Sequence, residues 1–225
     1  IPLDFVSTHA YGLEGYVDEC GRCIQKVIAD PDSISSDIIR TAEIIKKSSM
    51  PDLPLHFTEW NSSYSSRDPI HDSYHQAAYL LTRIRKAFRS VASMVYWAFS
   101  DIFEEAGPGL RPFHGGFGLV NIQGLLKPSF HIYRFLKMLS DNLLPCDDLY
   151  TFATCDKTGT QVLFWDYTIP EQDESDEEYY VRDLPSGKAP TARVELTGLQ
   201  PGSYLFSLYG VGYRLNDVYT LYRDL

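Results

Sequence analysis

The 225-residue chain has no apolar stretch approaching the roughly 18 residues that a membrane-spanning helix requires. Basic residues are few: 20 Lys and Arg stand against 30 Asp and Glu, a formal net charge of −10. We therefore expect neither a membrane nor a nucleic-acid partner, because phosphate binding requires clustered Lys and Arg. The first residues lack an initiating Met and the basic region of a signal peptide. We therefore expect that the chain does not begin at a natural N-terminus and that it carries no signal peptide. A soluble protein is predicted, with the cytoplasm favoured over secretion.

Cysteines are also few, and the four present do not form the pattern of a disulfide scaffold. Cys20 and Cys23 make a single Cys-x-x-Cys in a predicted loop or helix start, whereas Cys146 and Cys155 are isolated. A zinc site would require a second pair or histidines at ligand spacing, and the sequence shows neither. We interpret all four as structural thiols and expect no metal and no cofactor.

Hydrophobic residues make up 44% of the chain and charged residues 22%, which is ordinary globular composition. Before residue 145, apolar runs typical of strands alternate with helical patterns. The predicted strands are residues 3–8, 53–58 and 94–99, and the predicted helices are 35–47, 72–89 and 128–143. This alternation predicts a parallel sheet with right-handed crossovers.

After this point the pattern is all-β. Short strands are predicted at residues 149–155, 161–167, 179–182, 192–196 and 203–209, typical of a small antiparallel sandwich. Six of the eight residues 171–178 are acidic. We interpret this acidic segment as a solvated hairpin loop, since it lacks the Asp spacing and Gly of an EF-hand. The sequence thus predicts an α/β unit at 1–145 and an all-β domain at 146–225.

Polar or aromatic residues follow each predicted parallel strand, and ligands bind at the carboxyl ends of such strands. Glu59 comes directly after an apolar strand, and a Glu is almost never buried without a partner. It is therefore a candidate nucleophile or general acid/base, and Trp60 and Trp97 are candidates for a sugar-stacking wall. Asn61 opens an Asn-Ser-Ser glycosylation sequon, but a glycan so close to Glu59 would block the site, so we expect Asn61 unmodified.

Several segments resemble glycoside hydrolase family 39, the β-xylosidase family, which also contains α-L-iduronidases. The segments are residues 57–65 (Phe-Thr-Glu-Trp-Asn-Ser-Ser-Tyr-Ser), 68–72, 96–105, 112–119, 127–130, 162–167, 199–204 and, less closely, 211–219. The resemblance implies the last three strand–helix units of a (β/α)8 TIM barrel, strands six to eight, followed by a small antiparallel β-sandwich.

The same resemblance implies roles for individual residues. Glu59 matches the catalytic nucleophile at the end of strand seven. The implied substrate-binding residues are His9 and Tyr11 from strand six, Trp97 from strand eight, and Glu104 and Glu105 in the loop that follows. The reaction implied is retaining hydrolysis that removes β-D-xylosyl residues from xylo-oligosaccharides or aryl xylosides.

The family's acid/base is the Glu of an Asn-Glu-Pro motif after strand four, and no such motif occurs in this chain. A complete barrel also takes about 250 residues. We therefore expect the C-terminal portion of an enzyme that is inactive alone and either self-associates or binds an N-terminal barrel fragment. Three alternatives remain: an inactive carbohydrate-binding or structural remnant, an α-L-iduronidase-like hydrolase, and a complete enzyme of another type that uses this half-barrel, for example by pairing two copies.

Overall fold

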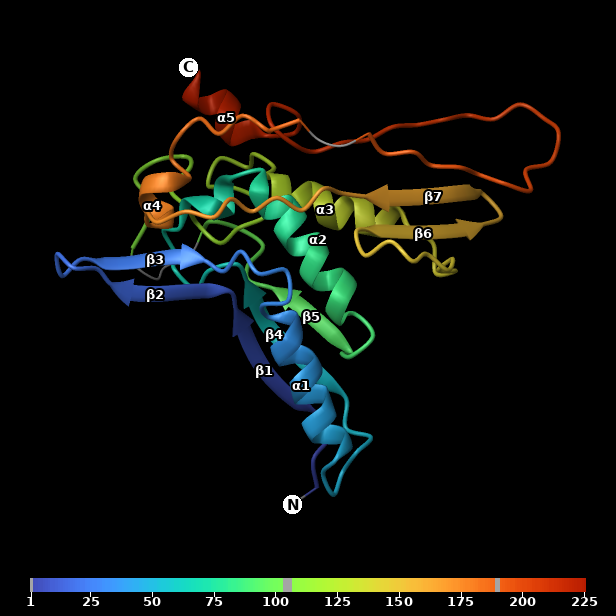
Figure 1. Cartoon of the computed structure of the whole chain (residues 1–225), viewed down its shortest axis with the longest axis horizontal. Helices are drawn as coiled ribbons and strands as arrows, with labels where there is room; N and C mark the ends of the chain where they lie inside the picture. Colours follow the sequence, from blue (N-terminus) through green and yellow to red (C-terminus); the bar gives the residue numbers. More distant parts are fainter. Residues whose placement is uncertain (1, 103–106, 189–190) are drawn as a thin grey trace.

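The first half of the chain contains the predicted parallel sheet. The computed structural model describes residues 2–102, 107–188 and 191–225. Strands β1 (Val6–Tyr11), β4 (Leu55–Asn61) and β5 (Ser93–Tyr96) lie in the order β1-β4-β5. Both outer strands pair with β4 in parallel. The carboxyl ends of the three strands therefore lie at one edge of the sheet (Figure 1).

Helices connect these strands. Helix α1 (Ser35–Lys46) precedes β4, α2 (His75–Ala87) joins β4 to β5, and α3 (Pro128–Met138) follows β5. Helix α2 packs against both α1 and α3. The three predicted strand–helix pairs are therefore present, with a hairpin inserted in the first.

Two helices are shorter in the structure than predicted. The helix predicted at 72–89 is divided, because the 3₁₀ helix η1 (Pro69–Asp72) ends at Ser73, whose backbone is extended (φ −77°, ψ 149°). The helix predicted at 128–143 ends at Met138, because Leu139 is extended (φ −70°, ψ 149°). The residues that follow run alongside the next strand instead.

A β-hairpin that is absent from the predicted elements follows β1. Strands β2 (Leu13–Val17) and β3 (Cys23–Val27) pair antiparallel. The Asp18 carboxylate accepts hydrogen bonds from the backbone N–H groups of Cys20 (2.9 Å) and Arg22 (2.8 Å) at the turn. The Cys-x-x-Cys therefore lies at a hairpin turn, which fits the predicted loop and not the alternative of a helix start. All four cysteines are free thiols.

The second half contains less sheet than predicted. Strands β6 (Thr151–Asp156) and β7 (Gly159–Phe164) form an antiparallel pair near two of the predicted strands. The strands predicted at residues 179–182, 192–196 and 203–209 are not formed in the described part of this half. Residues 191–209 instead follow a long exposed loop (Figure 1), and the chain ends in helix α5 (Val218–Arg223). Of the expected sandwich, one hairpin is present within the described residues of this half.

The acidic segment 171–178 is only partly solvated, so its prediction as a solvated loop is wrong for Asp176. This residue begins the short helix α4 (Asp176–Tyr179) and is 1% exposed. Its Oδ2 accepts a hydrogen bond from the Val27 N–H (2.7 Å), and its Oδ1 accepts one from Gln172 Nε2 (2.7 Å). The segment is therefore anchored to the β2–β3 hairpin.

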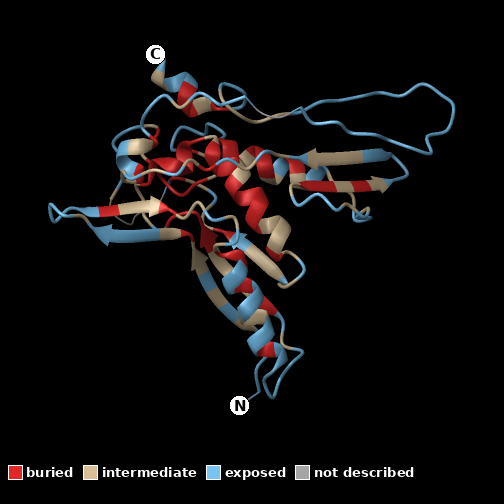
Figure 2. Cartoon of the chain, in the orientation of Figure 1, coloured by how far each residue is buried: buried red, intermediate tan, exposed pale blue. Residues whose placement is uncertain are grey.

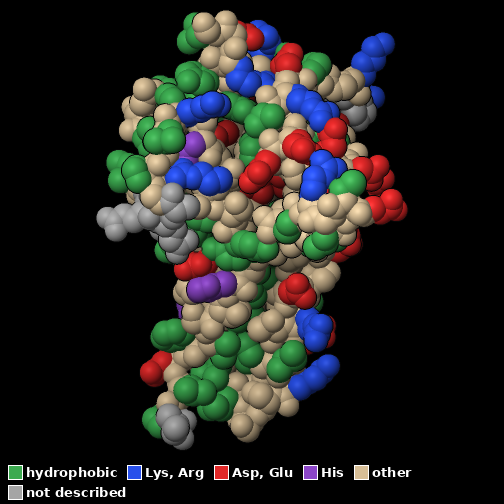
Figure 3. Space-filling view, turned by 90° about the vertical axis from the view of Figure 1, so that its left-hand side faces the viewer, with side chains coloured by type: hydrophobic (Ala, Val, Ile, Leu, Met, Phe, Trp, Pro, Cys, Tyr) green, Lys and Arg blue, Asp and Glu red, His purple; other side chains and the backbone are tan. Residues whose placement is uncertain are grey.

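The main core lies between the sheet and the helices (Figure 2). It includes Phe57 and Tyr96 from the strands, Ile38 and Leu80 from the helices, and Tyr180 from beyond the acidic segment. Hydrophobic side chains remain exposed over the end of the molecule that holds β1 and α1 (Figure 3). Within the described ranges, no helix has the length and apolar character needed to cross a membrane.

Candidate active site

The carboxylate of Glu59 lies near the carboxyl end of the central strand, next to two side chains from β1. His9 and Glu59 are direct partners in the parallel register. The Tyr11 hydroxyl donates a hydrogen bond to Glu59 Oε2 (2.9 Å), and His9 Nδ1 lies 3.3 Å from the same oxygen. The structure therefore brings together three of the predicted site residues.

Both contacts with Glu59 are made to one carboxylate oxygen. Among the described residues, Oε1 receives no hydrogen bond, and the side chain is 25% exposed. A carboxylate with one oxygen held in this way keeps its second oxygen available for attack. The local geometry thus suits a nucleophile at the mouth of a sheet.

Trp97 follows β5 at the same edge of the sheet and is half-buried. Its backbone N–H donates to the Trp60 carbonyl (3.1 Å), and its own carbonyl accepts from Asn61 Nδ2 (2.6 Å). Trp60 is 0% exposed and packs edge-on against Tyr96, with ring centroids 6.3 Å apart. The prediction of Trp60 as part of a sugar-stacking wall is therefore wrong, because its side chain belongs to the core.

Two other predicted site residues, Glu104 and Glu105, lie outside the residues that the structure describes. Tyr64, which is not among the predicted site residues, lies in the motif segment 57–65. Its ring is perpendicular to that of Tyr11, with centroids 6.3 Å apart, and its hydroxyl accepts a hydrogen bond from Gln25 Nε2 (3.2 Å). The β2–β3 hairpin therefore contacts the site through Tyr64.

A buried charged cluster holds together the loops that follow β4 and β5. Lys127 Nζ lies 2.6 Å from Asp72 Oδ1 and 2.8 Å from Asp101 Oδ2, and donates to the Gly116 carbonyl (2.9 Å). Asp101 Oδ1 accepts from the Gly118 N–H (2.7 Å). No sequence pattern identified this cluster, because its members come from separate segments of the chain.

Burial and charge act in opposite directions on this cluster. Burial lowers the pKa of Lys127, but attraction to Asp72 and Asp101 outweighs it, and the pKa is raised. Burial raises the pKa of Asp101, with a further increase from Asp72, although Lys127 opposes it. Both directions agree with a buried group that contains two carboxylates and one amine. The ammonium is therefore strongly held.

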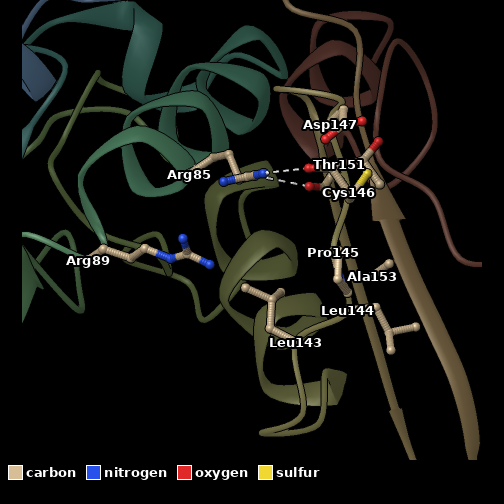
Figure 4. A pocket seen from close by; sticks show the side chains of 9 residues that line it. All are labelled: Arg85, Arg89, Leu143, Leu144, Pro145, Cys146, Asp147, Thr151 and Ala153. Atoms are coloured by element: carbon tan, nitrogen blue, oxygen red, sulfur yellow. Dashed lines mark hydrogen bonds between the residues drawn. The ribbon is translucent and has the colours of Figure 1, made fainter.

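A hollow in the surface lies away from Glu59. It has a volume of about 320 Å³ and is lined by the last turn of α2, the connection to β6 and β6 itself (Figure 4). Arg85 at its edge donates to the carbonyls of Thr151 (3.0 Å) and Cys146 (3.4 Å). None of the predicted site residues lines it. In the described ranges, no cluster of three or more His, Cys, Asp or Glu is suited to a metal ion.

Comparison with known proteins places the chain among the glycosyl hydrolases. A family model for glycosyl hydrolases family 39 matches residues 1–173. The chain belongs to this family, which confirms the resemblance found in its motifs.

A β-xylosidase from Geobacillus stearothermophilus is 38% identical over 152 residues, which are 64% of this chain and 29% of that protein. A solved monomeric β-xylosidase from Caulobacter crescentus CB15 is 38% identical, with a TM-score of 0.82. The match covers 99% of this chain and 45% of that enzyme. A solved GH39 enzyme from Xanthomonas axonopodis pv. citri is 37% identical, with a TM-score of 0.85. The match covers 99% of this chain and 44% of that enzyme. The chain thus spans less than half the length of these relatives.

Proposed function

We propose that this chain is the nucleophile-bearing portion of a retaining β-xylosidase, with Glu59 as the nucleophile. The observation that carries the proposal is the contact of one Glu59 oxygen with Tyr11 and His9 at the carboxyl ends of two parallel strands. The family and the two β-xylosidase relatives support the choice of a β-D-xyloside as substrate. In this assignment residues 1–145 supply barrel strands six to eight, and residues 146–225 an accessory β domain.

The proposed chemistry divides between this chain and a second carboxyl group. The second oxygen of Glu59, Oε1, attacks the anomeric carbon, the bond to the leaving oxygen breaks, and a covalent xylosyl ester forms with inverted configuration. Water then displaces the ester, which gives net retention. A partner carboxyl roughly 5–5.5 Å away protonates the leaving oxygen in the first step and activates water in the second. We propose that this acid/base comes from outside the 225 residues, which contain no Asn-Glu-Pro motif.

His9, Tyr11 and Trp97 would bind the sugar in the proposed site. Tyr11 and His9 hold the nucleophile from one side, and the half-buried indole of Trp97 supplies an apolar surface at the same sheet edge. Pyranose rings present apolar C–H faces, which pack favourably on aromatic rings. Glu104 and Glu105 are proposed to bind sugar hydroxyls.

A substrate that does not need the missing acid tests the nucleophile directly. A suitable reagent is a 2-deoxy-2-fluoro-β-D-xyloside with a dinitrophenolate leaving group. The dinitrophenolate departs without protonation, and the fluorine slows hydrolysis of the ester. We expect the 225-residue chain to acquire one xylosyl label on the peptide that contains Glu59, measured by mass spectrometry. The Glu59→Gln variant is the matched control and should remain unlabelled.

Two further measurements, xylobiose binding and labelling by a second reagent, separate the alternatives. Saturable binding of xylobiose without labelling would favour a carbohydrate-binding remnant. Faster labelling by the corresponding fluoro-iduronide would favour an iduronidase-like hydrolase, although uronate recognition usually requires a cation near the sugar carboxylate. Labelling at a residue other than Glu59 would contradict the assignment of the nucleophile.

A further inference from the structure

Two buried amide side chains connect helix α2 to the backbone of Trp97. Asn61 lies two residues after Glu59 at the end of β4, and Gln76 lies in the first turn of α2. Both are 0% exposed. Gln76 Nε2 donates to Asn61 Oδ1 (2.6 Å), and Asn61 Nδ2 donates to the Trp97 carbonyl (2.6 Å). The result is a continuous path from the helix to the residue proposed to bind the sugar.

The hydrogen-bond partners allow only one orientation of the Asn61 amide. Its oxygen faces two N–H donors, from Gln76 and from the backbone of Ser62 (2.7 Å), and its nitrogen faces a carbonyl. Rotation of the amide by 180° would place donor against donor and acceptor against acceptor. In a site closed to water, each unpaired polar group is costly. The pair therefore fixes both the orientation of Asn61 and the carbonyl that it binds.

We propose that Asn61 and Gln76 are positioning residues that fix Trp97, and through it the aromatic surface of the sugar site. The inference rests on the proposed function for the role of Trp97, but the contacts themselves do not depend on it. The Trp97 N–H is held by the Trp60 carbonyl (3.1 Å), so backbone groups on both sides of Trp97 are restrained by β4. Asn61 thus has a structural reason to be present beside the nucleophile, and its burial agrees with the prediction that it carries no glycan.

A matched pair of substitutions on α2 tests this proposal. Gln76→Met keeps the size of the side chain and removes the donor to Asn61. Thr82→Val is the control, because Thr82 is also 0% exposed on α2. Its Oγ1 accepts a hydrogen bond from the indole N–H of another tryptophan, Trp165 (2.9 Å). The chain is labelled with 5-fluorotryptophan, and its three indole resonances are assigned by single Trp→Phe variants.

In ¹⁹F NMR spectra we expect Gln76→Met to shift or broaden the Trp97 resonance and leave Trp165 unchanged, and Thr82→Val to do the reverse. An unchanged Trp97 resonance in the folded Gln76→Met chain would overturn the proposal. Should that variant fail to fold, Asn61→Asp, which removes the donor to the Trp97 carbonyl at nearly constant size, provides the same readout.

Xylobiose titration followed by the same resonances separates this proposal from the proposed function. We expect Gln76→Met to weaken binding about five- to tenfold, as expected for the loss of one well-formed buried hydrogen bond. A wild-type chain that binds no xylobiose, with Trp97 still responding to Gln76→Met, would contradict the proposed function and support the positioning role. Equal affinity of wild type and variant would contradict the positioning role alone.

Discussion

Lys127 and Asp101 form an ion pair from which solvent is excluded: Nζ lies 2.8 Å from Oδ2, and both side chains are 0% exposed. The same ammonium neutralises Asp72, so one cation serves two carboxylates. Such an arrangement is far more sensitive to loss of the cation than to replacement of the whole cluster by neutral groups.

Replacing Lys127 with Met should strongly destabilise the fold. Two buried carboxylates would be left without their cation, and breaking a buried ion pair in this way costs about 3–5 kcal/mol. Urea denaturation should show this decrease in the free energy of unfolding. The control is Lys137→Met on the exposed face of α3, which should change stability by less than about 0.5 kcal/mol. Similar stability of the two variants would contradict the role of the cluster.

Asp176 makes the stability of the chain depend on pH. Burial, together with the neighbouring carboxylate of Asp68, raises the pKa of Asp176 to about 9 from an ordinary value of 3.8. The folded chain therefore holds a proton that the unfolded chain loses above pH 3.8. This contribution to stability is complete below pH 3.8 and is lost progressively as pH rises toward about 9.

The Asp176→Asn variant removes this proton uptake, because an amide stays neutral. Relative to wild type, its free energy of unfolding should increase steadily between pH 5 and pH 9, by at most about 1.4 kcal/mol per pH unit. Asp173→Asn, an exposed residue in the same segment, should show no such trend. A difference between Asp176→Asn and wild type that does not vary with pH would contradict the explanation.

The four thiols should react with a disulfide reagent in two phases. Cys20 and Cys23 are exposed at the hairpin turn, whereas Cys146 and Cys155 are half-buried. Access limits the reaction of ordinary thiols, so two should react quickly and two slowly. The Cys20→Ser/Cys23→Ser double variant should retain only the slow phase. A single phase for all four, or fewer than four titratable thiols, would contradict the described exposures.

The chain should associate in solution. In the described ranges β1 and β5 each pair only with β4, so each has an open edge, and Phe5 and Val95 are 55% and 49% exposed beside those edges. Exposed edges and apolar surface favour pairing with another chain. Light scattering after size exclusion should give a mass that rises with concentration, and Val95→Lys should reduce it. A monomer at all concentrations would contradict this expectation.

The parallel sheet could be predicted because apolar strands and amphipathic helices are local patterns. Even so, the apolar pattern places the first strand at residues 3–8, whereas β1 is Val6–Tyr11. Its limits are set by pairing with β4, in which Val6 lies opposite Leu55. Glu59, His9 and Tyr11 could be assigned to one site because parallel strands place their carboxyl ends together.

Features set by distant partners could not be predicted. Residues 192–196 and 203–209 have the composition of short strands, but composition does not specify a pairing partner, and no strand forms there in the described ranges. The acidic composition around Asp176 favours solvation, yet its partner Val27 is 149 residues earlier in the chain. Trp60 follows Glu59 directly, but the packing of Tyr96 against it, not its sequence position, makes it part of the core.

The anchoring of the acidic segment determines where a protease can cut. Val27 and Lys26 in β3 both bond to the segment, the latter through the Gln172 carbonyl (3.0 Å), so its backbone is restrained despite its exposed glutamates. Glu195 lies in the exposed loop, with a side chain 69% exposed. A glutamate-specific protease should therefore cleave the folded chain after Glu195 before it cleaves within residues 171–178, although the acidic segment offers more glutamates.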